Sequence, residues 1–221
     1  MRQDFERNGR RLRFFSYICD MNDWDQDIFH LNDEQPQPVR GSLLVAKPTV
    51  GDFFFKRSLV LMVDADEGDG AMGVMVNHYM GYNLRDILPD IESTEEIPLF
   101  LGGPVGTQML FYVHTLGPEV IPEAIGVGDN VWFGGDFEAI KRYVELGAPI
   151  EGRIKFIVGY SGWGKDQLAS ELERHDWAVL NQGDRQLIMG DGDDDLWREA
   201  VSRFGSRYRL WLSLPNDPTN N

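Results

Sequence analysis

From Gly41 onward the chain is a series of short apolar runs separated by turns rich in glycine, proline or acidic residues. Short runs with many β-branched and large apolar side chains, bounded by such turns, predict strands. These runs lie at residues 42–46, 58–64, 72–76, 99–101, 109–114, 131–133, 154–158 and 177–180. The second and third runs are joined by an acidic, glycine-containing turn, so they predict a hairpin.

Helix signals come later in the chain and mix with the strands. Asn83 and Asp136 are capping residues at the starts of two predicted helices. A third helix is predicted at residues 166–174, and a fourth begins after Asp194 or Asp195. Because strand pairs dominate the first half, the pattern is not a strict β-α-β alternation. It favours an α+β fold over a doubly wound parallel sheet.

The first 40 residues differ from the rest because they are polar and aperiodic. We predict that residues 1–40 form a partly disordered extension and that residues 41–221 form a single domain. Residues 1–20 are rich in arginine, and Met21 is a candidate start of translation. The alternative is that residues 1–20 are a basic recruitment arm.

Composition limits the compartment and the partners. The only cysteine, Cys19, cannot form an intramolecular disulfide, which is typical of a reducing compartment such as the cytoplasm. No run approaches the roughly 18 apolar residues that a membrane span needs. The net charge of −15 repels phosphate backbones and argues against direct nucleic-acid binding. The late arginines 198, 203, 207 and 209 are interpreted as a solvated face. Partners are therefore expected among proteins and small molecules.

No cofactor or metal signature is complete. Residues 68–73 match the dinucleotide pattern G-x-G-x-x-G, but residues 74–76 predict a strand where that mechanism needs a helix. Residues 190–195 resemble a calcium loop, but Leu196 and Ser202 occupy the positions that need Gly and Glu. The four histidines show no metal-site spacing. We therefore expect no cofactor and no metal.

Residues 159–164, Gly-Tyr-Ser-Gly-Trp-Gly, resemble a nucleophile elbow. That motif, G-x-S-x-G, requires glycine at the position of Trp163. We interpret the segment as a turn between a strand and a helix, with two alternatives. It is either a tight turn anchored by Trp163 in the core, which we favour, or a catalytic site in which Ser161 acts with His114.

Gly102, Gly103 and Pro104 follow a predicted strand and redirect the chain. Two adjacent glycines let the backbone approach closely, either to a ligand or to a neighbouring segment, and a structural turn is the favoured interpretation. The candidate ligand or partner surface consists of Gly102, Gly103, Pro104, His114, Tyr160, Ser161 and Trp163. We assign no catalytic residue.

Several blocks, taken in order, resemble the YqgE/AlgH family of bacterial proteins. The blocks are residues 44–48, 55–60, 70–73, 76–77, 102–105, 113–114, 159–163, 167–168, 171–172 and 177. The resemblance runs from about Gly41 to the C-terminus. It implies an α+β fold whose largely antiparallel sheet curls into a small barrel flanked by helices. At Asp166 the family pattern more often has glycine, so a pocket there is expected to differ in this chain.

The resemblance carries over no biochemical activity, although some family members are labelled as candidate transcriptional regulators. The sequence shows no helix-turn-helix, zinc module or basic recognition helix, so any regulation is expected to act through protein contacts. We predict a non-catalytic binding or regulatory module that acts through protein or small-ligand contacts. The alternatives are a hydrolase or transferase that uses residues 159–164, and a transcriptional regulator.

Overall fold

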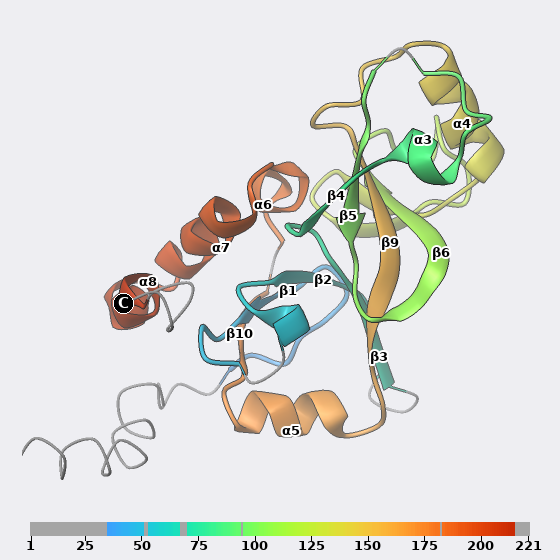
Figure 1. The fold of residues 1–221 in the computed structure, drawn as a ribbon. Coiled ribbons are helices and arrows are strands. Elements are labelled where there is room, and N and C mark those ends of the chain that lie inside the picture. The colour runs from blue at the N-terminus through green and yellow to red at the C-terminus, as the bar shows by residue number, and fades with distance from the viewer. Residues whose placement is uncertain (1–34, 51–52, 67–69, 94, 182, 215–221) are drawn as a thin grey trace, which may run out of the picture. The chain divides into compact units, whose positions relative to one another are not determined.

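The computed structural model describes residues 35–50, 53–66, 70–93, 95–181 and 183–214 (Figure 1). The predictions for residues 1–34, including the candidate start at Met21, lie outside these ranges. The strands are β1 Leu43–Ala46, β2 Leu59–Asp66, β3 Gly70–Met75, β4 Tyr79–Asn83, β5 Pro98–Leu101, β6 Val105–His114, β7 Ile125–Gly128, β8 Val131–Phe133, β9 Ile154–Trp163 and β10 Trp177–Leu180. The helices are η1 Phe53–Phe55, α3 Leu84–Ile87, α4 Phe137–Glu145, α5 Gln167–Glu173, α6 Arg185–Met189, α7 Asp193–Ser202, η2 Ser206–Tyr208 and α8 Arg209–Ser213.

The strands form one sheet in the order β10-β1-β2-β3-β9-β6-β8-β7, and β4 joins it through β5, which pairs with β9. All of these pairs are antiparallel except β5–β9. The predicted α+β class and largely antiparallel sheet are confirmed. The predicted small barrel is wrong, because closure requires the end strands to pair with each other. Over the described residues the order ends at β10 and β7, and the outer edge of β10 is met by a side chain, with Val179 N donating to Gln35 Oε1 at 3.0 Å.

Strand β9 links the two halves of the sheet (Figure 1). Its first half lies between β6 and β5, where Ile157 faces both Phe111 and Phe100. Its second half pairs with β3, where Trp163 faces Ala71. An apolar cluster packs around each half. One cluster includes residues of α3 and α4, and the other includes residues of α5, β1 and β10.

Most predicted elements are confirmed, including the hairpin β2–β3 and the start of α4, where Asp136 Oδ1 accepts from Glu138 N at 2.8 Å. The turn predicted at residues 159–164 is wrong, because β9 continues to Trp163. Gly159 bends the strand at a φ of +72° instead of ending it. The predicted caps of α7 are also wrong, because Gly192 occupies the N-cap and the helix already begins at Asp193.

Candidate functional site

The two glycines after β5 lie directly against the backbone of β9. A Cβ atom on Gly102 would lie 2.2 Å from the Gly159 carbonyl oxygen, and one on Gly103 would lie 2.2 Å from that of Tyr160. Ser161 is fully buried, and its hydroxyl donates to the Gly102 carbonyl at 3.0 Å. The close approach therefore serves a neighbouring segment, and Ser161 fastens that contact.

His114 lies elsewhere. It pairs with Ile154 at the start of β9, and Ser161 is seven residues further along that strand. At about 3.3 Å per residue, the separation is on the order of 20 Å. His114 is fully buried, its Nε2 donates to Gly134 O at 3.0 Å, and its Nδ1 accepts from Leu116 N. Burial lowers the pKa of this imidazole, which fits the neutral form. The structure therefore does not bring Ser161 and His114 together.

The remaining candidate surface residues divide between core and exterior. Pro104 is exposed and Tyr160 is half-buried, whereas Trp163 is buried in the core. Trp163 and Trp177 pack edge to face, with ring centroids 6.0 Å apart. Both indole N–H groups donate to Glu171 Oε2, at 2.8 and 2.7 Å. One carboxylate of α5 thus satisfies two buried indoles and holds α5 against the end of the sheet.

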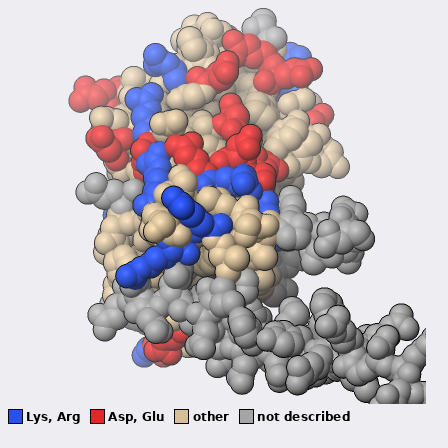
Figure 2. Space-filling view, turned by 90° about the vertical axis from the view of Figure 1, so that its left-hand side faces the viewer, with Lys and Arg blue, Asp and Glu red and all other residues tan. Residues whose placement is uncertain are grey.

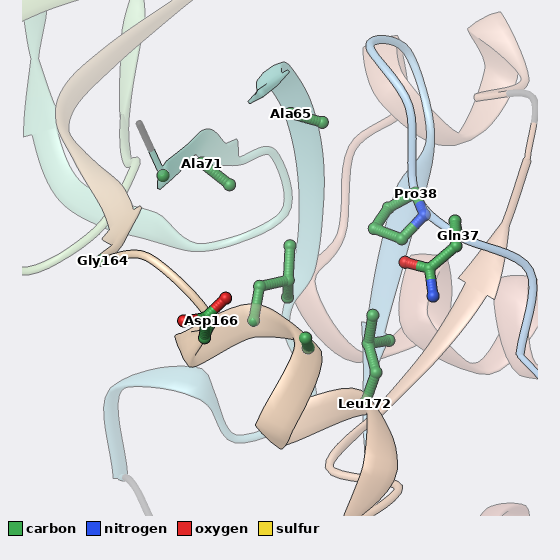
Figure 3. Close-up of a pocket in the computed structure, with 10 residues that line it drawn as sticks. Gln37, Pro38, Ala65, Ala71, Gly164, Asp166 and Leu172 are labelled. Carbon is green, nitrogen blue, oxygen red and sulfur yellow. The ribbon is translucent and has the colours of Figure 1, made fainter. Parts of the chain in front are cut away.

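A cavity of about 360 Å³ lies beside this tryptophan pair, and we call it the α5 cavity (Figure 3). It is lined by Gln37, Pro38, Ala65, Gly70, Ala71, Gly164, Asp166, Leu168, Ala169 and Leu172. Figure 3 shows Ala65 of β2 and Ala71 of β3 above α5. Asp166, at the start of α5, lies to the left, and Gln37 and Pro38 lie to the right. Its walls are mainly small or aliphatic side chains, and Asp166 is the only ionisable lining residue in the part of the chain that the structure describes.

Asp166 has a backbone conformation that would suit the glycine expected at this position from the sequence resemblance. Its φ is +61°, in the left-handed region that L-residues with a Cβ seldom adopt. Asp and Asn tolerate this region better than other non-glycine residues. Asp166 precedes α5, but its side chain makes no capping hydrogen bond to that helix. The carboxylate therefore belongs to the cavity and not to the helix cap.

Sequence reasoning missed a second polar cluster, here called the α7 junction, in which the buried Arg57, Asn77 and Lys155 meet the more exposed Asp193 and Asp194 at the start of α7. Arg57 donates to the Asp194 carboxylate. Asn77 Nδ2 donates to Asp193 O at 2.8 Å. Lys155 Nζ donates to the carbonyls of Val76 and Gly190, both at 2.6 Å. These bonds fasten the start of α7 to the sheet.

Lys155 is the most deeply buried lysine or arginine side chain of the junction, at 3% exposure. Burial lowers the pKa of its ammonium to about 8, although the negative charges of Asp191 and Asp193 raise it. The Phe100 ring lies 4.5 Å from Nζ and adds a favourable cation–π contact. A signal for this residue exists in the sequence, because Lys155 interrupts the apolar run 154–158.

Comparison with known proteins identifies the family. Residues 43–209 match the family described as AlgH-like. This chain belongs to the AlgH-like family. A UPF0301 protein of Parabacteroides distasonis is 37% identical over 196 residues, which cover 89% of this chain and 98% of the relative. A UPF0301 protein of Bacteroides fragilis is 38% identical over 195 residues, which cover 88% and 97%.

Two solved structures share the fold of this AlgH-like chain. The crystal structure of a protein from Corynebacterium diphtheriae has a TM-score of 0.68 and 19% identity, covering 83% of this chain and 96% of that one. The solution structure of the AlgH protein from Pseudomonas aeruginosa has a TM-score of 0.63 and 22% identity, covering 83% and 97%. At these identities the comparison shows a common fold.

The blocks that carried the family resemblance have structural explanations in this AlgH-like chain. Arg57 and Asn77 belong to the α7 junction, and Trp163, Glu171 and Trp177 form the hydrogen-bonded cluster beside the α5 cavity. Within the described ranges, no group of three or more histidine, cysteine or acidic residues is placed to hold a metal ion. No helix of the same residues is long and apolar enough to cross a membrane.

Proposed function

We propose that this chain is a non-catalytic binding or regulatory module of the cytoplasm, and that the α5 cavity holds a small ligand. The cavity is the observation that carries the proposal. Its volume of about 360 Å³ lies at the small end of the range for ligand sites. Its walls are fixed by β2, β3 and α5, and α5 is held in place by the bonds of Glu171 to the tryptophan pair.

The lining chemistry favours binding over catalysis. General acid–base catalysis needs a titratable group next to the reacting atoms and usually a partner that activates it. Asp166 alone among the described lining residues is titratable. Ser161 is the nucleophile of the hydrolase or transferase alternative, and its hydroxyl donates a hydrogen bond to the Gly102 carbonyl. We therefore retain the binding hypothesis.

A protein partner would find its contacts on the other side of the bend in β9. There, Val105 faces Tyr160 across the β6–β9 pair, and the Tyr160 and Phe111 rings are 6.1 Å apart. Val105 is 40% exposed and Met109 is 45% exposed. Of the predicted surface residues, Pro104 is exposed and Tyr160 is half-buried, and the side chains of Val105, Met109 and Phe111 would extend that surface.

Regulation through direct DNA contact is disfavoured in this proposal. Figure 2 shows lysine and arginine side chains on the face of α7 and α8, next to a band of acidic ones. Arg203, at the end of α7, is paired with Asp184 and Glu199. Because Arg203 is already paired with carboxylates, its contact with DNA would release few counterions and add little affinity. Sub-micromolar DNA binding by residues 21–221 at physiological salt would contradict the proposal.

Native mass spectrometry of tagged protein, recovered gently from its own host, tests the cavity. We expect a reproducible small-molecule mass on the wild type that Ala169→Trp removes, because a Trp side chain at this exposed lining position would fill the cavity mouth. The matched control is Leu146→Trp, since Leu146 is 83% exposed at the end of α4 and lies outside the cavity lining. A bound mass that survives Ala169→Trp would place the ligand elsewhere. A protein partner without any small molecule would favour the Tyr160 surface.

A further inference from the structure

Among the residues lining the α5 cavity that the structure describes, Asp166 is the single one with a charged side chain. Within the described ranges, this carboxylate forms neither an ion pair nor a hydrogen bond, whereas the Glu171 carboxylate nearby is fully used. Lys165, the neighbour of Asp166 in sequence, is exposed and is not part of the lining. The carboxylate is therefore free to accept hydrogen bonds from a ligand.

The described lining residues at the opposite end of the cavity are uncharged. Figure 3 shows Asp166 at the start of α5, across the cavity from Pro38 and the neutral amide of Gln37. Between these ends the walls are formed by Ala65, Ala71 and the aliphatic face of α5. A ligand that fits this arrangement has a small apolar body and a positive charge at the Asp166 end, where the carboxylate can accept its hydrogen bonds.

We propose that the α5 cavity selects a small cationic amphiphile, an apolar group that carries a single ammonium, and that Asp166 is the residue that sets this preference. The inference rests on the proposed binding function of the cavity. An ammonium offers several N–H donors to the carboxylate, and the hydrogen bond is charge-assisted. The chain's net charge of −15 also raises the local concentration of cations, whereas it repels carboxylate and phosphate ligands.

The geometry limits how strong the preference is. Asp166 is exposed, so water and salt screen its attraction for an ammonium. We expect the cationic probe to bind about two- to fivefold more tightly than a neutral probe of the same shape, which is the range of exposed ion pairs. A probe with a single aromatic ring suits the cavity volume, and its dissociation constant is expected on the order of millimolar.

The experiment uses the full chain labelled with ¹⁵N, titrated separately with 2-phenylethylamine, 2-phenylethanol and phenylacetate at neutral pH and low ionic strength. Amide shifts of Ala71, Gly164 and Ala169 report occupancy of the cavity. The test variant is Asp166→Asn, since Asn also tolerates a positive φ and keeps the backbone unchanged. The control is Asp90→Asn, which removes the same charge from an exposed loop after α3.

The wild type and Asp90→Asn are expected to bind the amine more tightly than the alcohol and the acid most weakly. In Asp166→Asn, which has the same net charge as Asp90→Asn, the advantage of the amine over the alcohol is expected to be about two- to fivefold smaller than in Asp90→Asn, with affinity for the alcohol unchanged. Equal binding of amine and alcohol by the wild type would overturn the inference and leave the binding function standing. An amine preference in Asp166→Asn as large as that in Asp90→Asn would do the same. Absence of shifts at the cavity with all three probes would overturn the proposed cavity itself, together with this inference.

Discussion

Replacing Lys155 by Met should change how stability depends on pH. Burial lowers the pKa of Lys155 from 10.5 to about 8 in the folded chain, so at intermediate pH the unfolded chain binds the extra proton. The contribution of this lysine to the free energy of unfolding therefore becomes more favourable as pH increases from about 8 to 10.5. At roughly 1.4 kcal/mol per pKa unit, burying the charged form costs about 3 kcal/mol in total, and most of that cost disappears by about pH 10.

The assay is urea unfolding of the wild type and Lys155→Met at several pH values from 7 to 10. Met is unbranched like Lys and one atom shorter, and it cannot titrate or donate to the carbonyls of Val76 and Gly190. The free energy of unfolding of the wild type should rise by about 2 kcal/mol relative to the variant between pH 8 and pH 10. The other titrating groups contribute equally to the free energies of unfolding of both proteins, so their contributions cancel in the difference. Parallel pH profiles would refute the reasoning, because they would mean that folding leaves the pKa of Lys155 unchanged.

Three substitutions test the contacts around β9 and α5 by the same urea method. Gly103→Ala should lower the free energy of unfolding by about 3 kcal/mol or more, because the new Cβ would lie 2.2 Å from a carbonyl oxygen and the backbone φ is +154°. A loss below about 1 kcal/mol would contradict this prediction. Glu171→Ala should cost about 3 kcal/mol by leaving two buried indole N–H groups without an acceptor, whereas Glu171→Gln should lose less because its amide oxygen still accepts. Asp166→Val should cost about 1–2 kcal/mol at its positive φ, and Asp166→Gly should stay within about 0.5 kcal/mol of the wild type.

The fold was predictable where the signal is local. Asp136 caps α4 with its own side chain, and the apolar runs that became β1 and β2 are fully or mostly buried. Strands β4 and β7 escaped prediction because their glycines and exposed side chains give no apolar alternation. The run of glycines in 159–164 suggested a turn, but only the pairing of β9 with β3 shows that the strand continues.

The candidate site was predictable only in part, because its contacts join segments that are far apart in sequence. The residue type of Gly102 and Gly103 predicts that something approaches their backbone closely. Whether that is a neighbouring chain segment or a ligand is decided only by the position of Tyr160 in the structure. The α7 junction brings Arg57 to Asp194 across 137 positions, which no local pattern encodes. The cavity likewise needs three separate segments and has no sequence motif of its own.

Position 166 separates the requirements of the fold from those of the ligand. The backbone there needs a residue that tolerates a φ of +61°, and Gly, Asn and Asp all meet that need. The side chain makes no contact that holds α5 in place, since Glu171 performs that task. The residue can therefore vary among AlgH-like proteins without loss of the fold, and a change from Asp to Gly or Asn removes the only charge among the described lining residues. A relative with glycine at this position is then expected to bind 2-phenylethylamine and 2-phenylethanol with equal affinity, and a Gly→Asp substitution in that relative should create the amine preference.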